Sequence, residues 1–191
     1  MTVPAPTLMT AEELWVYEPP DKRAELVRGR LLVREPPGYR HGVIEVRLVV
    51  ALSNHRAAEQ RTLGLAKPRG QLVCGGVGFT LQRNPDTVRA PAISYIRLER
   101  CPPPDLLSYP EFAPDLAIEV RSPSNRAGRM LAKVADLLNG GAQLVWIVDP
   151  ERQQAHVYRA DGSDATLTAP DSLSGEDVLP GLAIPLSALL D

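Results

Sequence analysis

A carboxylate and a lysine on consecutive predicted elements could form a catalytic pair. Glu119 lies in the alternating segment DLAIEVR, which predicts a strand, and Lys133 lies in the helix predicted after the turn SPSN. An acid on a strand and a lysine on the next helix can converge near the end of the strand. Phosphodiester hydrolysis suits such a pair, because the carboxylate can hold a divalent metal that activates water and the lysine can orient that water or stabilise developing charge.

A second basic residue follows on the same strand. Arg121 shares a face with Glu119, about 6.6 Å away at about 3.3 Å per residue. Its planar guanidinium suits contact with phosphate, but it is a poor general base because it stays protonated. The alternative is structural: Arg121 pairs with Glu119 or with Asp115.

The remaining candidates each have a plainer interpretation. Lys133 could be an ordinary boundary lysine that buries its stem beside an apolar stripe. Glu25 could be a surface acid of a hairpin. His41 and Glu45 are spaced i,i+4 and could bind a metal, although a helical surface pair explains the same spacing.

The first sixty residues predict a helix, a hairpin and a longer helix. Thr10 and Glu13 have the spacing of a capping box, which predicts a short helix over 10–17. Residues 24–35 predict a hairpin that turns at Arg28-Gly29, and residues 40–59 show the apolar spacing of an amphipathic helix.

The rest of the chain predicts strands around one more helix. Runs 71–82 and 88–97 are of strand type, with a bulge expected at CGGVG. Met130, Leu131, Val134, Leu137 and Leu138 form the predicted helix stripe. Three further strands are expected at 143–148 (buried), 154–159 and 164–168, and the tail LPGLAIPLSALLD is expected to pack loosely. The order indicates an α/β fold, a mixed sheet flanked by helices, in a single domain over 1–191.

Composition narrows the class of protein. The net charge of −2 gives no global basic field for nucleic acid, although a local basic groove is compatible with it. Two cysteines make neither a disulfide framework nor a zinc motif. No stretch predicts a membrane span or a signal peptide, so a cytoplasmic protein is expected.

Several of these segments together resemble the Uma-two family of restriction endonucleases, within the PD-(D/E)XK nuclease superfold. The strongest matches are APDLAIEVRSPSN, the helix with Lys133, and NGGAQLVWIVDPERQQAHVYR; AELVRGRLL and His41 at a helix start are also similar. The resemblance covers the chain from about residue 10 to the end.

The resemblance implies roles for individual residues. Glu119 would be a ligand of Mg²⁺ or Mn²⁺, Lys133 the catalytic lysine, and Glu25 a supporting acid. Arg121 would stand at the strand position from which the signature lysine has moved, and it would hold phosphate. The implied substrate is DNA, and a homodimer is expected by the same resemblance.

One position departs from the family pattern. The family has a metal-binding Asp in a strand of the form R-x-P-D, and here the stretch reads RAPAISYI, with Ala92 in its place. Asp86 lies about 20 Å away along an extended strand, and Asp115 about 13 Å from Glu119. Because two ligands of one ion must both lie within about 2.0–2.6 Å of it, neither acid is a convincing substitute.

The strand–SPSN–helix unit and Ala92 together leave three hypotheses open. In the first, the chain is a metal-dependent endonuclease of DNA, whether or not Ala92 inactivates it. In the second, it is a non-catalytic relic that binds nucleic acid or protein. In the third, Ala92 is an introduced change in a once-active enzyme.

Overall fold

The computed structural model describes residues 8–17, 23–122 and 127–191 of the chain. Most of the predicted SPSN turn, residues 123–125, lies outside these ranges. Within the described residues, no helix is long and apolar enough to cross a membrane.

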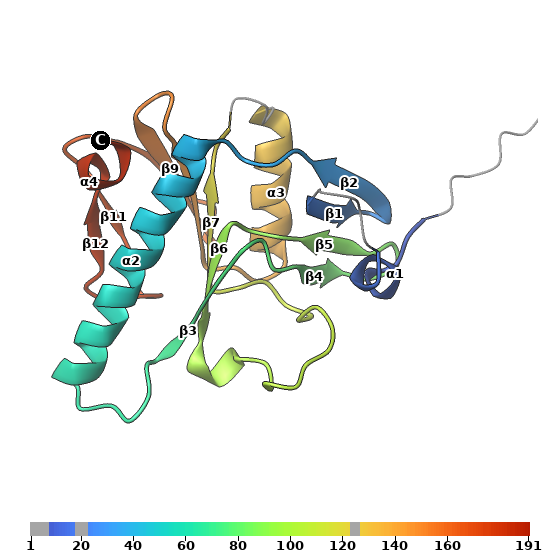
Figure 1. Ribbon diagram of the computed structural model, residues 1–191, viewed down its shortest axis with the longest axis horizontal. Coiled ribbons are helices and arrows are strands. Elements are labelled where there is room, and N and C mark those ends of the chain that lie inside the picture. Colours follow the sequence, from blue (N-terminus) through green and yellow to red (C-terminus); the bar gives the residue numbers. More distant parts are fainter. Residues whose placement is uncertain (1–7, 18–22, 123–126) are drawn as a thin grey trace, which may run out of the picture.

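A six-stranded mixed sheet forms the centre of the molecule (Figure 1). Its central strands β7 and β8 run parallel, and the other neighbours are antiparallel. In spatial order the strands are β10 (Asp164–Thr168), β9 (Gln154–Arg159), β8 (Leu144–Asp149), β7 (Leu116–Val120), β6 (Ile93–Arg97) and β3 (Gly70–Cys74). Every residue of β7 and β8 is buried, which confirms the continuous apolar run as a central strand.

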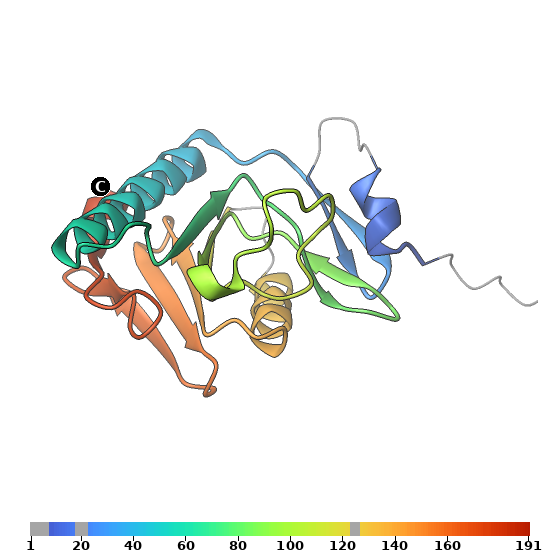
Figure 2. The same ribbon diagram turned by 90° about the horizontal axis from the view of Figure 1, so that it is seen from below.

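Helices cover both faces of this sheet. The long helix α2 (Tyr39–Thr62) packs on one face through Ile44, Leu48 and Leu52, against Leu116, Ile118 and Val120 of β7 and their neighbours. The helix α3 (Ala127–Asn139) packs on the other face, where Ala117 of β7 lies. Alternation along β7 therefore points Glu119 to the α3 side, and Figures 1 and 2 show α2 and α3 on opposite sides of the sheet.

The C-terminal tail corrects an expectation. It forms β11 (Ser172–Ser174), β12 (Ala183–Pro185) and α4 (Leu186–Leu190), and these elements close the α2 side of the core. Leu186 and Leu189 are buried, so the expected loose packing is wrong. The prolines and glycine of LPGLAIP interrupt any strand pattern, yet β12 within this segment pairs antiparallel with β11.

A second, smaller sheet lies beyond α3. Its order is β2 (Arg30–Arg34), β1 (Arg23–Val27), β5 (Thr87–Arg89) and β4 (Phe79–Gln82). The predicted hairpin at 24–35 is β1–β2, and the predicted first helix is α1 (Ala11–Trp15), with the Thr10–Glu13 capping box present. Leu26 of β1 packs under α1, so the alternation turns its neighbour Glu25 the other way.

The two sheets share one bent hairpin. The predicted strand 71–82 is divided into β3 and β4, and the predicted strand 88–97 into β5 and β6, one piece in each sheet. Gly75 and Gly76 have positive φ, which allows the backbone to change direction at CGGVG. On the return strand the break is Ala90-Pro91-Ala92, so Ala92 lies where the chain passes from one sheet to the other. The short helix η1 (Leu98–Arg100) follows β6.

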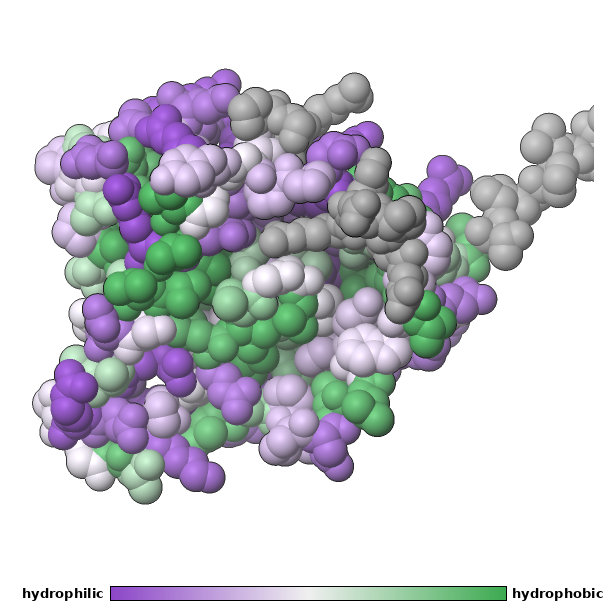
Figure 3. All heavy atoms as spheres, viewed as in Figure 1, coloured by the Kyte–Doolittle hydropathy of each residue, from purple (hydrophilic) through white to green (hydrophobic). Residues whose placement is uncertain are grey.

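The stripe of α3 differs from the prediction at two positions. Leu131 is 53% exposed, whereas Lys133 is fully buried between Met130 and Leu137. On α2, Val46 and Val50 are likewise exposed, and Figure 3 shows hydrophobic residues on this face of the molecule.

Candidate active site

Glu25 is buried and forms several ion pairs, so it is not a surface acid of the hairpin. Its carboxylate accepts a hydrogen bond from the backbone N–H of Ala90 at 3.0 Å and forms ion pairs with Arg34 and Arg89, both at 3.0 Å, and with Lys133 at 2.6 Å. Burial raises the pKa of Glu25, but the Lys133, Arg34 and Arg89 charges outweigh it and lower the pKa to about 2. The carboxylate therefore stays ionised.

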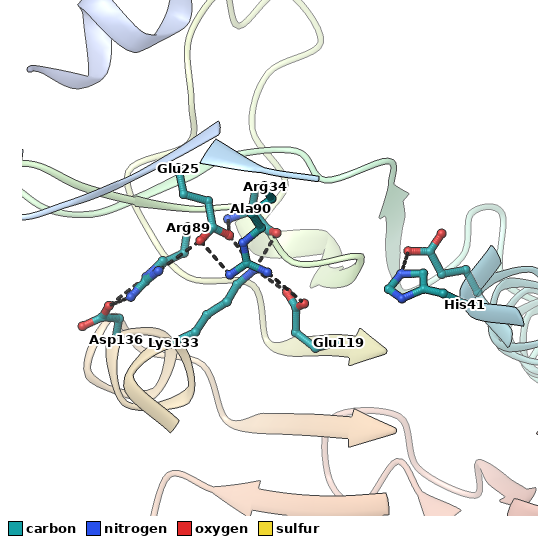
Figure 4. A network of polar contacts seen from close by, with 9 residues as sticks. Glu25, Arg34, His41, Arg89, Ala90, Glu119, Lys133 and Asp136 are labelled. Carbon is teal, nitrogen blue, oxygen red and sulfur yellow. Dashed lines mark hydrogen bonds and ion pairs between the residues drawn. The ribbon is translucent and has the colours of Figure 1, made fainter. Parts of the chain in front are cut away.

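Glu119 and Lys133 meet as the sequence indicated. Glu119 projects from β7 toward α3, where it forms an ion pair with the Lys133 ammonium, and Arg34 lies 3.9 Å from its other oxygen. Lys133 enters from α3, and its Nζ also donates to the carbonyl oxygen of Ala90 at 2.7 Å. Figure 4 shows these side chains converging between the two sheets.

The cluster is balanced in charge. Arg89 links Glu25 to Asp136 of α3, which it contacts at 2.6 Å. Three carboxylates thus face three cations: Glu25, Glu119 and Asp136 against Lys133, Arg34 and Arg89. Such a buried network needs every partner, because removing one leaves an uncompensated charge.

Sequence reasoning did not identify Arg34, Arg89 or Asp136. A signal existed for the two arginines. Glu25 pairs with Leu32 in the hairpin register, so Arg34 is its diagonal neighbour. Arg89 is the first residue of RAPA, the segment that corresponds to the R-x-P-D pattern of the family. Asp136 had no such signal, since its contact depends on how α3 packs against the smaller sheet.

A pocket of about 180 Å³ opens beside the cluster. Its wall includes three acids, Glu25, Glu35 and Glu119, and also Ala92, so the position of the missing carboxylate lies in the same cavity as these acids. Arg129 of α3 also lines the pocket and is exposed, and it forms no ion pair within the part of the chain that the structure describes.

The two acids considered as substitutes are committed elsewhere. Asp86 caps α1 by accepting from the N–H of Ala11 at 2.8 Å and pairs with Arg83. Asp115 accepts from the N–H of Arg97 and pairs with Arg100 at 2.6 Å. Neither lines the pocket, so neither replaces the carboxylate absent at Ala92.

Arg121 lies outside the pocket. It follows the end of β7 and forms an ion pair with Asp149 at 2.6 Å, so neither of its expected structural partners, Glu119 and Asp115, is the one it contacts. The phosphate contact expected for Arg121 stays a prediction.

His41 and Glu45 form the expected helical pair, with Nε2 and Oε1 2.9 Å apart. The pair is not a plain surface feature, because His41 lines the pocket from α2, and Figure 4 shows its ring pointing toward the side on which Glu119 lies. Its Nδ1 is buried without a hydrogen-bond partner among the described residues.

The residues present do not fit a divalent metal well. Among the described residues, no group of three or more His, Cys, Asp or Glu side chains is arranged to hold a metal ion. Glu25 and Glu119 are both neutralised by cations, and Lys133 lies between them. A hard dication needs carboxylate oxygens that carry spare negative charge, and the side chain at Ala92 supplies none.

The arrangement of the mixed sheet, the buried acids and the lysine is that of a nuclease-like α/β fold. The sequence profile of the Uma2 family, described as "Putative restriction endonuclease", matches residues 11–187. The chain belongs to this family, which confirms the resemblance found in the sequence.

A solved structure has the same fold. It is described as a "putative nuclease belonging to DUF820" from Anabaena variabilis ATCC 29413, and it superposes with a TM-score of 0.79 over 95% of this chain and 97% of that chain, at 19% sequence identity. No curated protein sequence matches the chain at a significant level.

Proposed function

We propose that the pocket is the phosphodiester-hydrolysing site of a DNA endonuclease, disabled at its metal-binding step by Ala92. The observation that supports the proposal is that Ala92, Glu25 and Glu119 line one cavity, while Lys133 lies buried behind its wall and forms ion pairs with both acids. Glu119 is the metal-facing acid in this proposal, and Lys133, which is buried and ion-paired with Glu25 and Glu119, acts on the site through Glu119. Because a carboxylate is missing, Mg²⁺ or Mn²⁺ binds weakly and the chain cleaves slowly or not at all.

Cleavage assays on matched variants test the proposal. The chain, its Ala92→Asp variant and an Ala92→Asp/Glu119→Ala variant would be incubated with supercoiled plasmid or single-stranded DNA in Mg²⁺ or Mn²⁺. We expect cleavage by Ala92→Asp alone, at least 100-fold faster than by the other two, since one carboxylate ligand is worth several kcal/mol of charge stabilisation.

Two results would contradict it. Equal cleavage by the original chain and by Ala92→Asp would mean that another ligand replaces the carboxylate. Cleavage by Ala92→Asp that survives Glu119→Ala would mean that Glu119 is not the metal-facing acid.

The second candidate is a binding module without cleavage, which the internal charge balance of the cluster favours. Under this alternative DNA is held by the uncommitted Arg129, while Arg121 is retained by Asp149. Fluorescence anisotropy with a labelled single-stranded oligonucleotide would compare Arg129→Gln with Arg121→Gln across a salt series. If either arginine contacts a phosphate, its substitution by Gln should make the negative slope of log K against log salt less steep by about 0.7. If neither substitution changes the slope, neither arginine is the contact.

A homodimer, in which two such pockets would act on the two strands of a duplex, stays a prediction of the family resemblance. Light scattering after size exclusion would measure it.

A further inference from the structure

Three oxygen groups surround the Lys133 ammonium. It forms ion pairs with Glu25 at 2.6 Å and with Glu119, and it donates a hydrogen bond to the Ala90 carbonyl oxygen at 2.7 Å. Glu119 Oε1 is buried and accepts no hydrogen bond among the described residues, so Lys133 compensates it by charge alone. The three oxygen groups come from β1, from the link between β5 and β6, and from β7, so one buried charge joins the two sheets and α3.

Three oxygen groups around one cation are also the beginning of a metal site. A dication needs anionic or carbonyl oxygens at about 2.0–2.6 Å, and carboxylates and backbone carbonyls are its usual ligands. The Lys133 Nζ occupies the point on which Glu25, Glu119 and Ala90 converge, and the side chain is fully buried. Desolvation makes it costly for these carboxylates to remain there without a cation.

We infer that the Lys133 ammonium is the resident cation of this acidic pair and takes the place of a metal ion. The pair therefore needs no dication to remain folded. Removing Lys133 leaves three carboxylates against the two guanidinium groups of Arg34 and Arg89, one negative charge in excess, and exposes an oxygen site. The oxygen ligands left behind are two carboxylates and one backbone carbonyl, and Ca²⁺, which accepts flexible coordination, should fit them better than Mg²⁺, which demands near-ideal octahedral geometry.

Thermal melts with and without cations test the inference. The chain, Lys133→Ala and Lys133→Arg would be melted in EDTA and in 10 mM CaCl₂, MnCl₂ or MgCl₂. We expect Lys133→Ala to melt below the chain in EDTA and to gain about 5 °C or more in CaCl₂, as for a ligand about 100-fold above its Kd. The chain and Lys133→Arg, which both keep a positive charge there, should show no comparable gain.

The double variant Lys133→Ala/Glu119→Gln is the matched control, because it removes one of the oxygen ligands and should abolish the response. If Lys133→Ala does not fold in EDTA, Lys133→Met preserves the apolar stem, and recovery of folding in CaCl₂ becomes the measurement. A failure of both variants to respond to any of the three cations overturns the inference, as does an equal response by the unsubstituted chain. The inference rests on the geometry of the acidic pair and not on cleavage, so this experiment and the Ala92→Asp assay can fail independently.

Discussion

Glu25 illustrates how the energetics of a single residue depend on its partners. The carboxylate is buried, which on its own would favour the protonated form, yet three cations keep it ionised. Its sequence context, a polar residue in an alternating hairpin, is that of a surface acid. The packing of the smaller sheet against α3, through β4 and β5, turns that side of the hairpin inward, so the burial of Glu25 could not be predicted from local pattern.

The depressed pKa of Glu25 predicts a stability that depends on pH. The folded pKa of about 2 lies below the ordinary value of 4.5, so the stabilisation is complete above pH 4.5 and is lost as the pH falls toward 2. The difference corresponds to roughly 3 kcal/mol. We expect Glu25→Gln to unfold more easily at pH 7 and to lose less stability between pH 4.5 and pH 2, as measured by urea denaturation at each pH.

Glu12→Gln provides the control for this measurement. Glu12 pairs with Arg83 on the surface, and its pKa is lowered chiefly by that hydrogen bond. Exposed pairs of this kind contribute little to stability. A pH dependence that Glu12→Gln alters as strongly as Glu25→Gln would contradict the account of the buried cluster.

Among the elements, those with a strong periodic pattern could be predicted and those that depend on tertiary contacts could not. The capping box, the β1–β2 hairpin, α2, β7 and β8 all lie where the sequence placed them. An irregularity was expected at CGGVG, but the division of the β3–β4 and β5–β6 hairpin between two sheets was not predicted, because a strand pattern does not say which sheet the strand joins. Ala92 lines the pocket because it lies at this bend, between β5 and β6. The site therefore depends on a feature of the fold that the sequence did not predict.

Two leucines test the corrected burial of α3 and of the C-terminal tail. Leu131 belongs to the predicted core stripe but is 53% exposed, whereas Leu186 belongs to the tail expected to be loose and has 0% exposure. We expect Leu186→Ala to lower the free energy of unfolding by about 2–5 kcal/mol, the usual range for a buried leucine. Leu131→Ala should change it by less than about 0.5 kcal/mol. Urea denaturation would measure both, and the reverse order would contradict the packing of α4 on α2.

At the scale of the whole molecule, the site is also the joint between the two sheets. Glu25 belongs to the smaller sheet, Glu119 to the larger one, and Lys133 to the helix packed between them. From the sequence, Glu119 and Lys133 could be brought together, because a strand and the helix that follows it have a constrained geometry. The arginines and Asp136 could not be placed as reliably, since they come from segments whose proximity depends on the complete fold.

We propose that Ala92 is the defect that prevents a metal from binding beside Glu119. Isothermal titration of MnCl₂ into the chain, into Ala92→Asp and into Ala92→Asp/Glu119→Gln would measure this binding directly, without any requirement for a particular DNA sequence. We expect Ala92→Asp to bind Mn²⁺ at least ten times more tightly than the chain, and Glu119→Gln to remove the gain. Micromolar binding of Mn²⁺ by the unsubstituted chain would contradict the account.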